Sequence, residues 1–383
     1  MVAIPVLLTG GTEVQTLSMV RVLRTAGYIV TVCCYYEFDQ SMVVRFEEAG
    51  AEIVLFKLDR SGYKHFKIIE LIRRLVAVIK ELDPDIIHVQ YVAPGLLPII
   101  AARIARAPTV FSTVHIAGRT AYGWKAKILL RIAAALATSF FCVSKGVEDF
   151  WFGDSKVFHP GDACKGRKHF TIYNAVDVSA IEEAVDGMPH DKLRDSLGIE
   201  GRPVIGVVGR LAYQKGHAIL LDAIAEMAGL VPGVLLLVIG DGPLRGELER
   251  RAKELDIGGH VRWLGTRGQE EVFKLYGAMD VLAMPSLYEG FGLTAAEAMA
   301  AGLPVVGTSV DGLSEVIEDD LTGYIVPAGD SRALSEALLG LLTNAGLRKE
   351  MGERGRLRVK KLFSMERLNQ SLIAAYELLS GKS

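Results

Sequence analysis

The stretch PVIGVVGRLAYQKGHAILLDAIAEMAGLVPGVLLLVIGDGP, residues 203–243, carries the pattern that decides the fold. It opens with a nearly continuous apolar run, which is typical of a strand buried on both faces. Residues 216–230 have the apolar spacing of a helix, and residues 234–243 form a second apolar run that ends in a glycine turn. This order predicts two parallel strands joined by a crossover helix.

The same alternation of short apolar runs and helical segments occupies the first half of the chain. Helical spacing is strongest at 65–82, where Phe66, Ile69, Ile72, Val76 and Ile79 are predicted to form one apolar stripe. The sequence therefore predicts an α/β protein with two Rossmann-like, doubly wound domains that face each other across a cleft. Sheets of this kind bind ligands at the carboxyl ends of their strands.

The domain boundary is expected near residues 177–200, where the polar stretch DGMPHDKLRDS interrupts the apolar pattern. A chain of 383 residues that is 50% hydrophobic suits two cores better than one. We predict an N-terminal domain at 1–180 and a C-terminal domain at 181–365. The last helix, 366–383, is expected to return to the N-terminal domain.

Charge and cysteine content exclude several classes of protein. The net charge of -2 gives no reason to expect a nucleic acid partner. The first 180 residues hold 21 Lys and Arg against 16 Asp and Glu, which is either a chance excess or a sign of an anionic partner. The cysteines show no metal-type spacing. Residues 1–11 lack the charged region of a signal peptide and are predicted to form a first strand, so we expect a cytoplasmic protein.

Two glutamates stand eight positions apart in SLYEGFGLTAAEAMAAGLP, residues 286–304. Glu289 precedes a Gly-Phe-Gly turn, and Glu297 lies within a helix that is expected to begin near Leu293 or Thr294. Eight helical residues rise about 12 Å, roughly the reach from a sugar ring across a diphosphate to a ribose. Two carboxylates can accept hydrogen bonds from hydroxyl groups, and the N–H groups at the helix start can donate hydrogen bonds to phosphates between them. The alternative is a pair of solvated surface glutamates.

Three further groups stand at predicted strand ends. Gly10 and Gly11 permit close approach of the backbone to an anion at a helix N-terminus, although such a turn is often only structural. Arg210 and Lys215 suit a diphosphate, with solvated loop cations as the alternative. His115 follows a strand on the expected cleft side, and a lone histidine of this kind is often structural.

Taken together, these segments resemble the GT-B glycosyltransferases that include glycogen synthase, sucrose synthase and bacterial mannosyl- and N-acetylglucosaminyl-transferases. The shared pattern is Glu-x7-Glu at Glu289 and Glu297, preceded in order by TVHIAG (113–118), TIYNAVD (171–177), VVGRLAYQKG (207–216) and IGDGP (239–243). The similarity covers nearly the whole chain.

This resemblance implies transfer of a sugar from a nucleotide-diphosphate-sugar, a UDP- or GDP-sugar, to a hydroxyl acceptor with retention of anomeric configuration. It implies neither a cofactor nor a bound metal. Glu289 and His115 would act at the donor sugar, and Glu297 would bind the ribose. The remaining implied contacts are with the sugar and diphosphate (Gly11, Arg210, Lys215, Phe291, Gly292, Leu293, Thr294) and with the base (Gly265, Thr266, Arg267).

The acceptor is expected to bind the N-terminal domain. Residues 115–131 combine Arg119, Lys125 and Arg131 with Tyr122 and Trp124, and a basic, aromatic helix of this kind can lie on an anionic membrane. The acceptor would then be a lipid-linked or cell-envelope glycan, reached by peripheral contact with the inner face of the membrane. The alternatives are an ordinary amphipathic helix and a soluble sugar, inositol phosphate or peptide acceptor.

Other functions remain open at this stage. They are a phosphorylase or epimerase-like nucleotide-sugar enzyme of the same fold, a non-catalytic nucleotide-sugar binding protein, and a dinucleotide-dependent oxidoreductase. The last is disfavoured because the Gly10–Gly11 turn lacks the G-x-G-x-x-G pattern.

Overall fold

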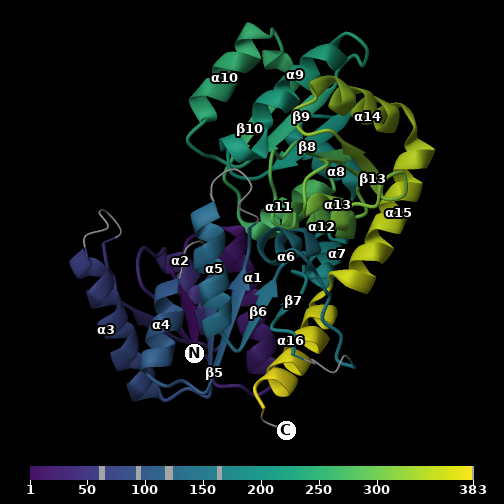
Figure 1. The fold of residues 1–383 in the computed structure, drawn as a ribbon. Coiled ribbons are helices and arrows are strands. Elements are labelled where there is room, and N and C mark those ends of the chain that lie inside the picture. Colours follow the sequence, from purple (N-terminus) through teal and green to yellow (C-terminus); the bar gives the residue numbers. More distant parts are fainter. Residues whose placement is uncertain (60–64, 92–95, 117–123, 162–165, 382–383) are drawn as a thin grey trace. The chain divides into compact units, whose positions relative to one another are not determined.

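The computed structural model describes residues 1–59, 65–91, 96–116, 124–161 and 166–381 (Figure 1). Internal contacts divide the chain into two units, Met1–Ala175 with Met365–Ser383, and Val176–Ser364. The first unit thus combines both ends of the chain, and the second is one continuous segment. Within the described part of the chain, no helix is both long and apolar enough to span a bilayer.

The first unit is built on a parallel sheet in the order β3-β2-β1-β4-β5-β6-β7. Its strands are β1 Val2–Ile4, β2 Thr31–Cys34, β3 Glu52–Leu55, β4 Ile86–Tyr91, β5 Thr109–Val114, β6 Ser139–Cys142 and β7 His169–Thr171. Its helices are α1 Gly11–Thr25, α2 Gln40–Glu48, α3 His65–Leu82, α4 Leu96–Ile104, α5 Trp124–Leu136, α6 Lys145–Phe152 and α16 Met365–Leu379.

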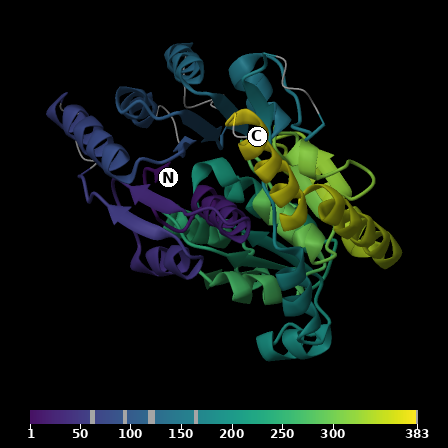
Figure 2. The same cartoon turned by 90° about the horizontal axis from the view of Figure 1, so that it is seen from below.

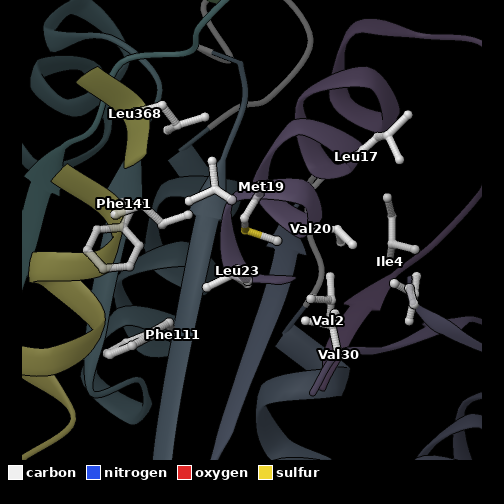
Figure 3. Close-up of a cluster of buried hydrophobic side chains, with 14 of the residues drawn as sticks. Val2, Ile4, Leu17, Met19, Val20, Leu23, Val30, Phe111, Phe141 and Leu368 are labelled. Carbon is white, nitrogen blue, oxygen red and sulfur yellow. The ribbon is translucent and has the colours of Figure 1, made fainter. Parts of the chain in front are cut away.

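Helices cover both faces of this sheet. Figure 2 shows α3, α4 and α5 on the opposite face from α1 and α2. The C-terminal helix α16 packs against α1. Figure 3 shows Leu17, Val20 and Leu23 of α1 among the buried side chains of this face, with Leu368 of α16 on the side of Phe141. Burial of apolar side chains on both faces holds the parallel strands together.

The predicted stripe on α3 was only partly right, because Ile79 is buried, Ile72 and Val76 are half-buried, and Ile69 is exposed. The buried row of this helix is Leu71, Leu75 and Ile79, whereas Ile69 is 55% exposed. The buried residues follow an i, i+4, i+8 row, which is the ridge that a helix presents to its neighbours. Because α3 carries apolar residues around more than half of its circumference, the sequence alone did not determine which face would be buried.

The second unit contains a parallel sheet in the order β10-β9-β8-β11-β12-β13. Its strands are β8 Val204–Val208, β9 Leu235–Ile239, β10 Val261–Gly265, β11 Val281–Met284, β12 Val305–Thr308 and β13 Gly323–Val326. Its helices are α7 Val178–Asp186, α8 His190–Leu197, η1 Tyr213–Lys215 (3₁₀), α9 His217–Ala228, α10 Arg245–Glu254, η2 Gly258–His260 (3₁₀), α11 Gln269–Tyr276, α12 Leu293–Ala300, α13 Leu313–Val316, α14 Ser331–Thr343 and α15 Ala345–Leu362.

The strand order of the second unit reverses between β8 and β11. The chain runs outward from β8 through β9 to β10, and then resumes on the other side of β8 with β11, β12 and β13. The loops that follow β8 and β11 therefore leave neighbouring strands in opposite directions. This is the position at which doubly wound sheets bind their ligands. Both units have the predicted α/β architecture.

Candidate active site

A lysine and a glutamate meet at the reversal point of the second sheet. Lys215 ends η1 after β8, and Glu289 lies in the loop between β11 and α12. The Lys215 Nζ donates a hydrogen bond to the Glu289 Oε2 at 2.6 Å, and the Ser286 hydroxyl lies 3.4 Å from the same oxygen. Both side chains of the pair are partly buried, 26% and 16% exposed. An ion pair shielded in this way is screened less by salt than a surface pair.

Close approach of two backbones fixes the position of the pair. Gly216 has φ +67, and a Cβ there would lie 1.9 Å from the carbonyl oxygen of Pro285. The N–H of Leu287 donates to the carbonyl of Gln214 at 2.8 Å. Only glycine tolerates both this conformation and this contact. The loops after β8 and β11 are thereby held together, and with them Lys215 and Glu289.

Helix α12 begins at Leu293, as predicted, with Gly292 as its N-cap at φ +101. The N–H of Gly312 donates to the carbonyl of Glu289 at 3.3 Å, and a Cβ on Gly312 would lie 2.5 Å from the Phe291 backbone. Phe291 itself is buried and packs edge-on against Phe363. Its side chain therefore serves the core, so any contact of Phe291 with a ligand must come from its backbone.

Glu297 lies on the second turn of α12 and is partly exposed. Burial of its carboxylate raises the pKa of Glu297 to about 7, and a hydrogen bond from the Tyr276 hydroxyl at 2.9 Å opposes this rise only in part. Burial also raises the pKa of Tyr276 well above its usual value. Glu297 is thus not the solvated helix residue of the alternative interpretation. Tyr276 was missed by the sequence analysis, because nothing in the spacing links it to Glu297.

The remaining residues predicted in this unit also lie at carboxyl ends of strands. Arg210, after β8, is exposed, and its side chain makes no hydrogen bond or ion pair within the described residues. Gly265 ends β10 with φ +70. Thr266 and Arg267 follow it, and Arg267 pairs with Glu271 at 3.0 Å. Because β10 is the edge strand, two positions from β8, these residues lie farther along the same sheet edge than the Lys215–Glu289 pair.

His217, the first residue of α9, is an unexpected neighbour of Lys215. It is 5% exposed, and neither of its ring nitrogens has a hydrogen-bond partner within the described residues. Burial, and to a lesser extent the nearby Lys215 charge, lower the pKa of His217 to about 4. The imidazole is therefore neutral at physiological pH.

Gly11 and His115 belong to the first unit. Gly11 is the first residue of α1, and the carboxylate of Glu13 folds back over the same turn, because a Cβ on Gly10 would lie 2.6 Å from Glu13 Oε2. Burial raises the pKa of Glu13. A carboxylate at this place stabilises the positive end of the helix. Glu13 was not predicted to have a role, although an acidic residue is favoured in the first turn of a helix.

His115 follows β5 and is buried, 8% exposed. Its Nε2 lies 2.8 Å from Oε1 of Gln90 on β4, a residue that the sequence analysis did not single out. Burial lowers the pKa of His115 to about 4. Among the described residues, no cluster of three or more His, Cys, Asp or Glu side chains has the arrangement of a metal site.

Comparison with known families gives a match in each unit. The family described as Glycosyltransferase Family 4 matches residues 9–179, and Glycosyl transferases group 1 matches residues 189–358. The chain is 37% identical over 197 residues to the D-inositol 3-phosphate glycosyltransferase of Corynebacterium urealyticum, covering 49% of this chain and 46% of that protein. It spans about half the length of the inositol phosphate glycosyltransferases that it matches.

Longer matches are more distant. The phosphatidyl-myo-inositol mannosyltransferase of Mycolicibacterium smegmatis is 27% identical over 388 residues, covering 97% of this chain and 91% of that protein. The solved structure of Anabaena HepE in complex with UDP and glucose has a TM-score of 0.80 at 20% identity, covering 98% of this chain and 99% of that one. Since a glycosyltransferase family matches each unit and solved glycosyltransferase structures share the fold along the whole length, the chain belongs to the GT-B glycosyltransferases of the family 4-like group.

Proposed function

We propose that this protein transfers a sugar from a nucleotide-diphosphate-sugar to a hydroxyl acceptor with retention of anomeric configuration. The observation that carries the proposal is Glu289, held by Lys215 at 2.6 Å where the strand order reverses and immediately before the N-terminus of α12. Relatives named for transfer to inositol phosphate and for mannosyl transfer agree with this chemistry. The HepE structures contain UDP or UDP-glucose, which supports a UDP-sugar donor.

The donor diphosphate is proposed to bind between Arg210, Lys215 and the N–H groups of Gly292, Leu293 and Thr294. The exposed Arg210 guanidinium has no partner among the described residues and so is available to a phosphate. Lys215 already neutralises Glu289, so it can hold that carboxylate toward the sugar while facing a phosphate oxygen. Free N–H groups at the start of α12 add positive potential. Gly11, the first residue of α1 in the first unit, is proposed as a further donor-binding residue.

The nucleoside is proposed to bind along the same sheet edge. Glu297 would accept hydrogen bonds from the ribose hydroxyls, and the hydrogen bond that Tyr276 donates to Glu297 orients the carboxylate. The base would lie against the backbone of Gly265, Thr266 and Arg267 at the end of β10. Since this contact is mostly to backbone, the side chains do not discriminate between UDP and GDP.

The reaction is proposed to proceed on one face of the sugar, with the leaving phosphate helping to take the proton from the acceptor hydroxyl. Cations and a helix N-terminus would stabilise the charge that develops on the diphosphate, so no bound metal is required. Glu289 is proposed to bind sugar hydroxyls rather than to attack the anomeric carbon, since Lys215 and Ser286 occupy one of its oxygens. His115 is proposed to face the sugar near the reactive carbon.

The acceptor is proposed to be the hydroxyl group of a lipid-linked or cell-envelope glycan. The support is helix α5, which exposes Trp124 (69%), Ile128 (47%) and Ile132 (45%) on the same face as Lys125 and Arg131. Apolar and cationic side chains mixed on one face suit an anionic membrane surface. The predicted contributions of Arg119 and Tyr122 lie outside the described residues.

Two variants test this function. Nucleotide diphosphate should raise the melting temperature of the wild type by mass action. Glu289→Ala is expected to lower transfer at least a hundredfold while leaving the shift caused by UDP or GDP nearly unchanged. Glu297→Ala should reduce that shift, because it removes the ribose contact. Equal loss of nucleotide binding in both variants would contradict the proposed roles of the two glutamates. A wild-type protein that binds the donor but shows neither transfer nor slow hydrolysis of the donor would contradict the proposed activity.

A further inference from the structure

Strands β4 and β5 place four polar side chains on one face of the first sheet. His88 and Gln90 alternate along β4, while Thr113 and His115 alternate along β5 and its continuation, and Gln90 pairs in register with Thr113. His88 (1% exposed), Gln90 (3%) and His115 (8%) are buried. Buried polar groups need hydrogen-bond partners, so their contacts can be followed atom by atom.

The two histidines are held differently. Both nitrogens of His88 have partners, because Nδ1 lies 2.6 Å from the Tyr376 hydroxyl and Nε2 lies 2.7 Å from the Thr113 hydroxyl. His115 has a single partner within the described residues, the carbonyl oxygen of Gln90, which lies 2.8 Å from Nε2. Nδ1 of His115 is not among the buried atoms that lack a partner. Within the described residues, no hydrogen bond therefore holds this nitrogen.

The orientation of the Gln90 amide decides which nitrogen of His115 carries the proton. Its NH₂ group points at the Met19 sulfur, 3.6 Å away, so its carbonyl oxygen faces His115. A carbonyl oxygen can only accept, and Nε2 must therefore be the N–H donor. In a neutral imidazole the other nitrogen then carries a lone pair.

We propose that Gln90 is a positioning residue that holds His115 in the Nε2–H tautomer and so leaves the lone pair on Nδ1. A cavity of about 40 Å³ borders both residues, so packing alone does not hold the ring, and the hydrogen bond to Gln90 supplies the restraint. A role of this tautomer in transfer rests on the proposed function, whereas the tautomer itself does not.

The tautomer is measured directly by two-dimensional ¹H–¹⁵N spectra of protein labelled with ¹⁵N-histidine. The signal of His115 is identified by its absence in His115→Ala. The expected spectrum shows a protonated Nε2 and an unprotonated Nδ1 in the wild type, and a mixture of tautomers in Gln90→Met, which keeps the side-chain length but lacks the acceptor. Gln90→Leu serves as a second variant. Gln370→Met, the same substitution at an exposed position of α16, is the control and should leave the spectrum unchanged.

A protonated Nδ1 in the wild type, or a Gln90→Met spectrum identical to that of the wild type, would overturn the assignment. Kinetics test the role in transfer. Gln90→Met is expected to lower kcat about tenfold with less than a twofold change in donor KM, because Gln90 is not among the proposed nucleotide contacts. An unchanged kcat overturns this role. If the wild type transfers no sugar at all, the proposed function fails, and the spectra alone decide the tautomer.

Discussion

The ring of His217 is buried without a hydrogen-bond partner, and this has a consequence for stability. Its pKa of about 4 in the folded protein lies below the usual value of 6.5. As the pH falls below 6.5, His217 becomes protonated in the unfolded chain but stays neutral in the folded protein. The free energy of unfolding therefore declines until the pH reaches about 4, by about 1.4 kcal/mol per pH unit for one such histidine.

We predict that His217→Leu is less sensitive to acid than the wild type. The comparison is urea denaturation at pH 7, 6 and 5. The difference in unfolding free energy between the two proteins should change in favour of the variant by about 1 kcal/mol for each unit of pH. His190→Gln, which replaces a half-exposed imidazole, is the control and should follow the wild type. Parallel curves for His217→Leu and the wild type would show that His217 finds a partner or reaches water.

At the level of elements, one glycine couples two loops. Gly216→Ala would place a methyl group 1.9 Å from the Pro285 carbonyl oxygen at φ +67. We predict a loss of stability above about 2 kcal/mol and at least a tenfold loss of transfer, because Lys215 is moved away from Glu289. Gly229→Ala, at the other end of α9, is the control. Gly229 has φ -80 and nothing within 4 Å of an added Cβ. Equal effects of the two substitutions would refute the coupling.

Helix α5 gives a second prediction at this level. Reversing two charges with Lys125→Glu and Arg131→Glu should weaken binding to vesicles containing anionic lipid more than tenfold, because each cation near such a surface contributes about 1 kcal/mol. The control is Arg250→Glu with Lys253→Glu on α10, which makes the same change of charge on exposed positions of the second unit. Co-sedimentation measures both. The proposed membrane contact would be refuted if the wild type bound the vesicles as weakly as the α5 variant does, or if the α5 substitutions did not change the binding.

The positions of helices and strands were predicted better from the sequence than the contacts between side chains of different elements. The run at 203–243 gave β8, α9 and β9 correctly, because period and length decide such elements. The start of α12 was also predicted, since Gly292 allows a left-handed turn that begins a helix. The buried face of α3 was predicted only in part, since Ile79 is buried and Ile69 is exposed. The roles of Gln90, Glu13 and Tyr276 were missed, because each depends on which strands and turns become neighbours, and spacing along the chain does not encode that.

At the level of the whole molecule, the two units are expected to differ in their dependence on the C-terminus. Helix α16 buries Leu368, Leu372 and Tyr376 in the first unit, and Tyr376 is a partner of His88. Burial of three such side chains stabilises a fold by at least about 5 kcal/mol, which is comparable to the total stability of many domains.

We predict that removal of residues 365–383 unfolds the first unit and leaves the second folded. Hydrogen exchange followed by mass spectrometry should show fast exchange in β1, β4 and β5 and continued protection in β8, β9 and β11. Removal of residues 381–383 alone is the control and should change nothing. Protection of β4 and β5 in the shortened protein would mean that the first unit does not need α16.

The position of α16 also has a consequence for synthesis. Residues 176–364 form one continuous segment with its own core, whereas the first unit is assembled from both ends of the chain. During translation, all residues of the second unit therefore leave the ribosome before α16, with Tyr376, can pack onto the first unit. The second unit can therefore complete its fold before the first unit does, although most of the first unit is translated earlier. The first unit is complete only after α16 has left the exit tunnel.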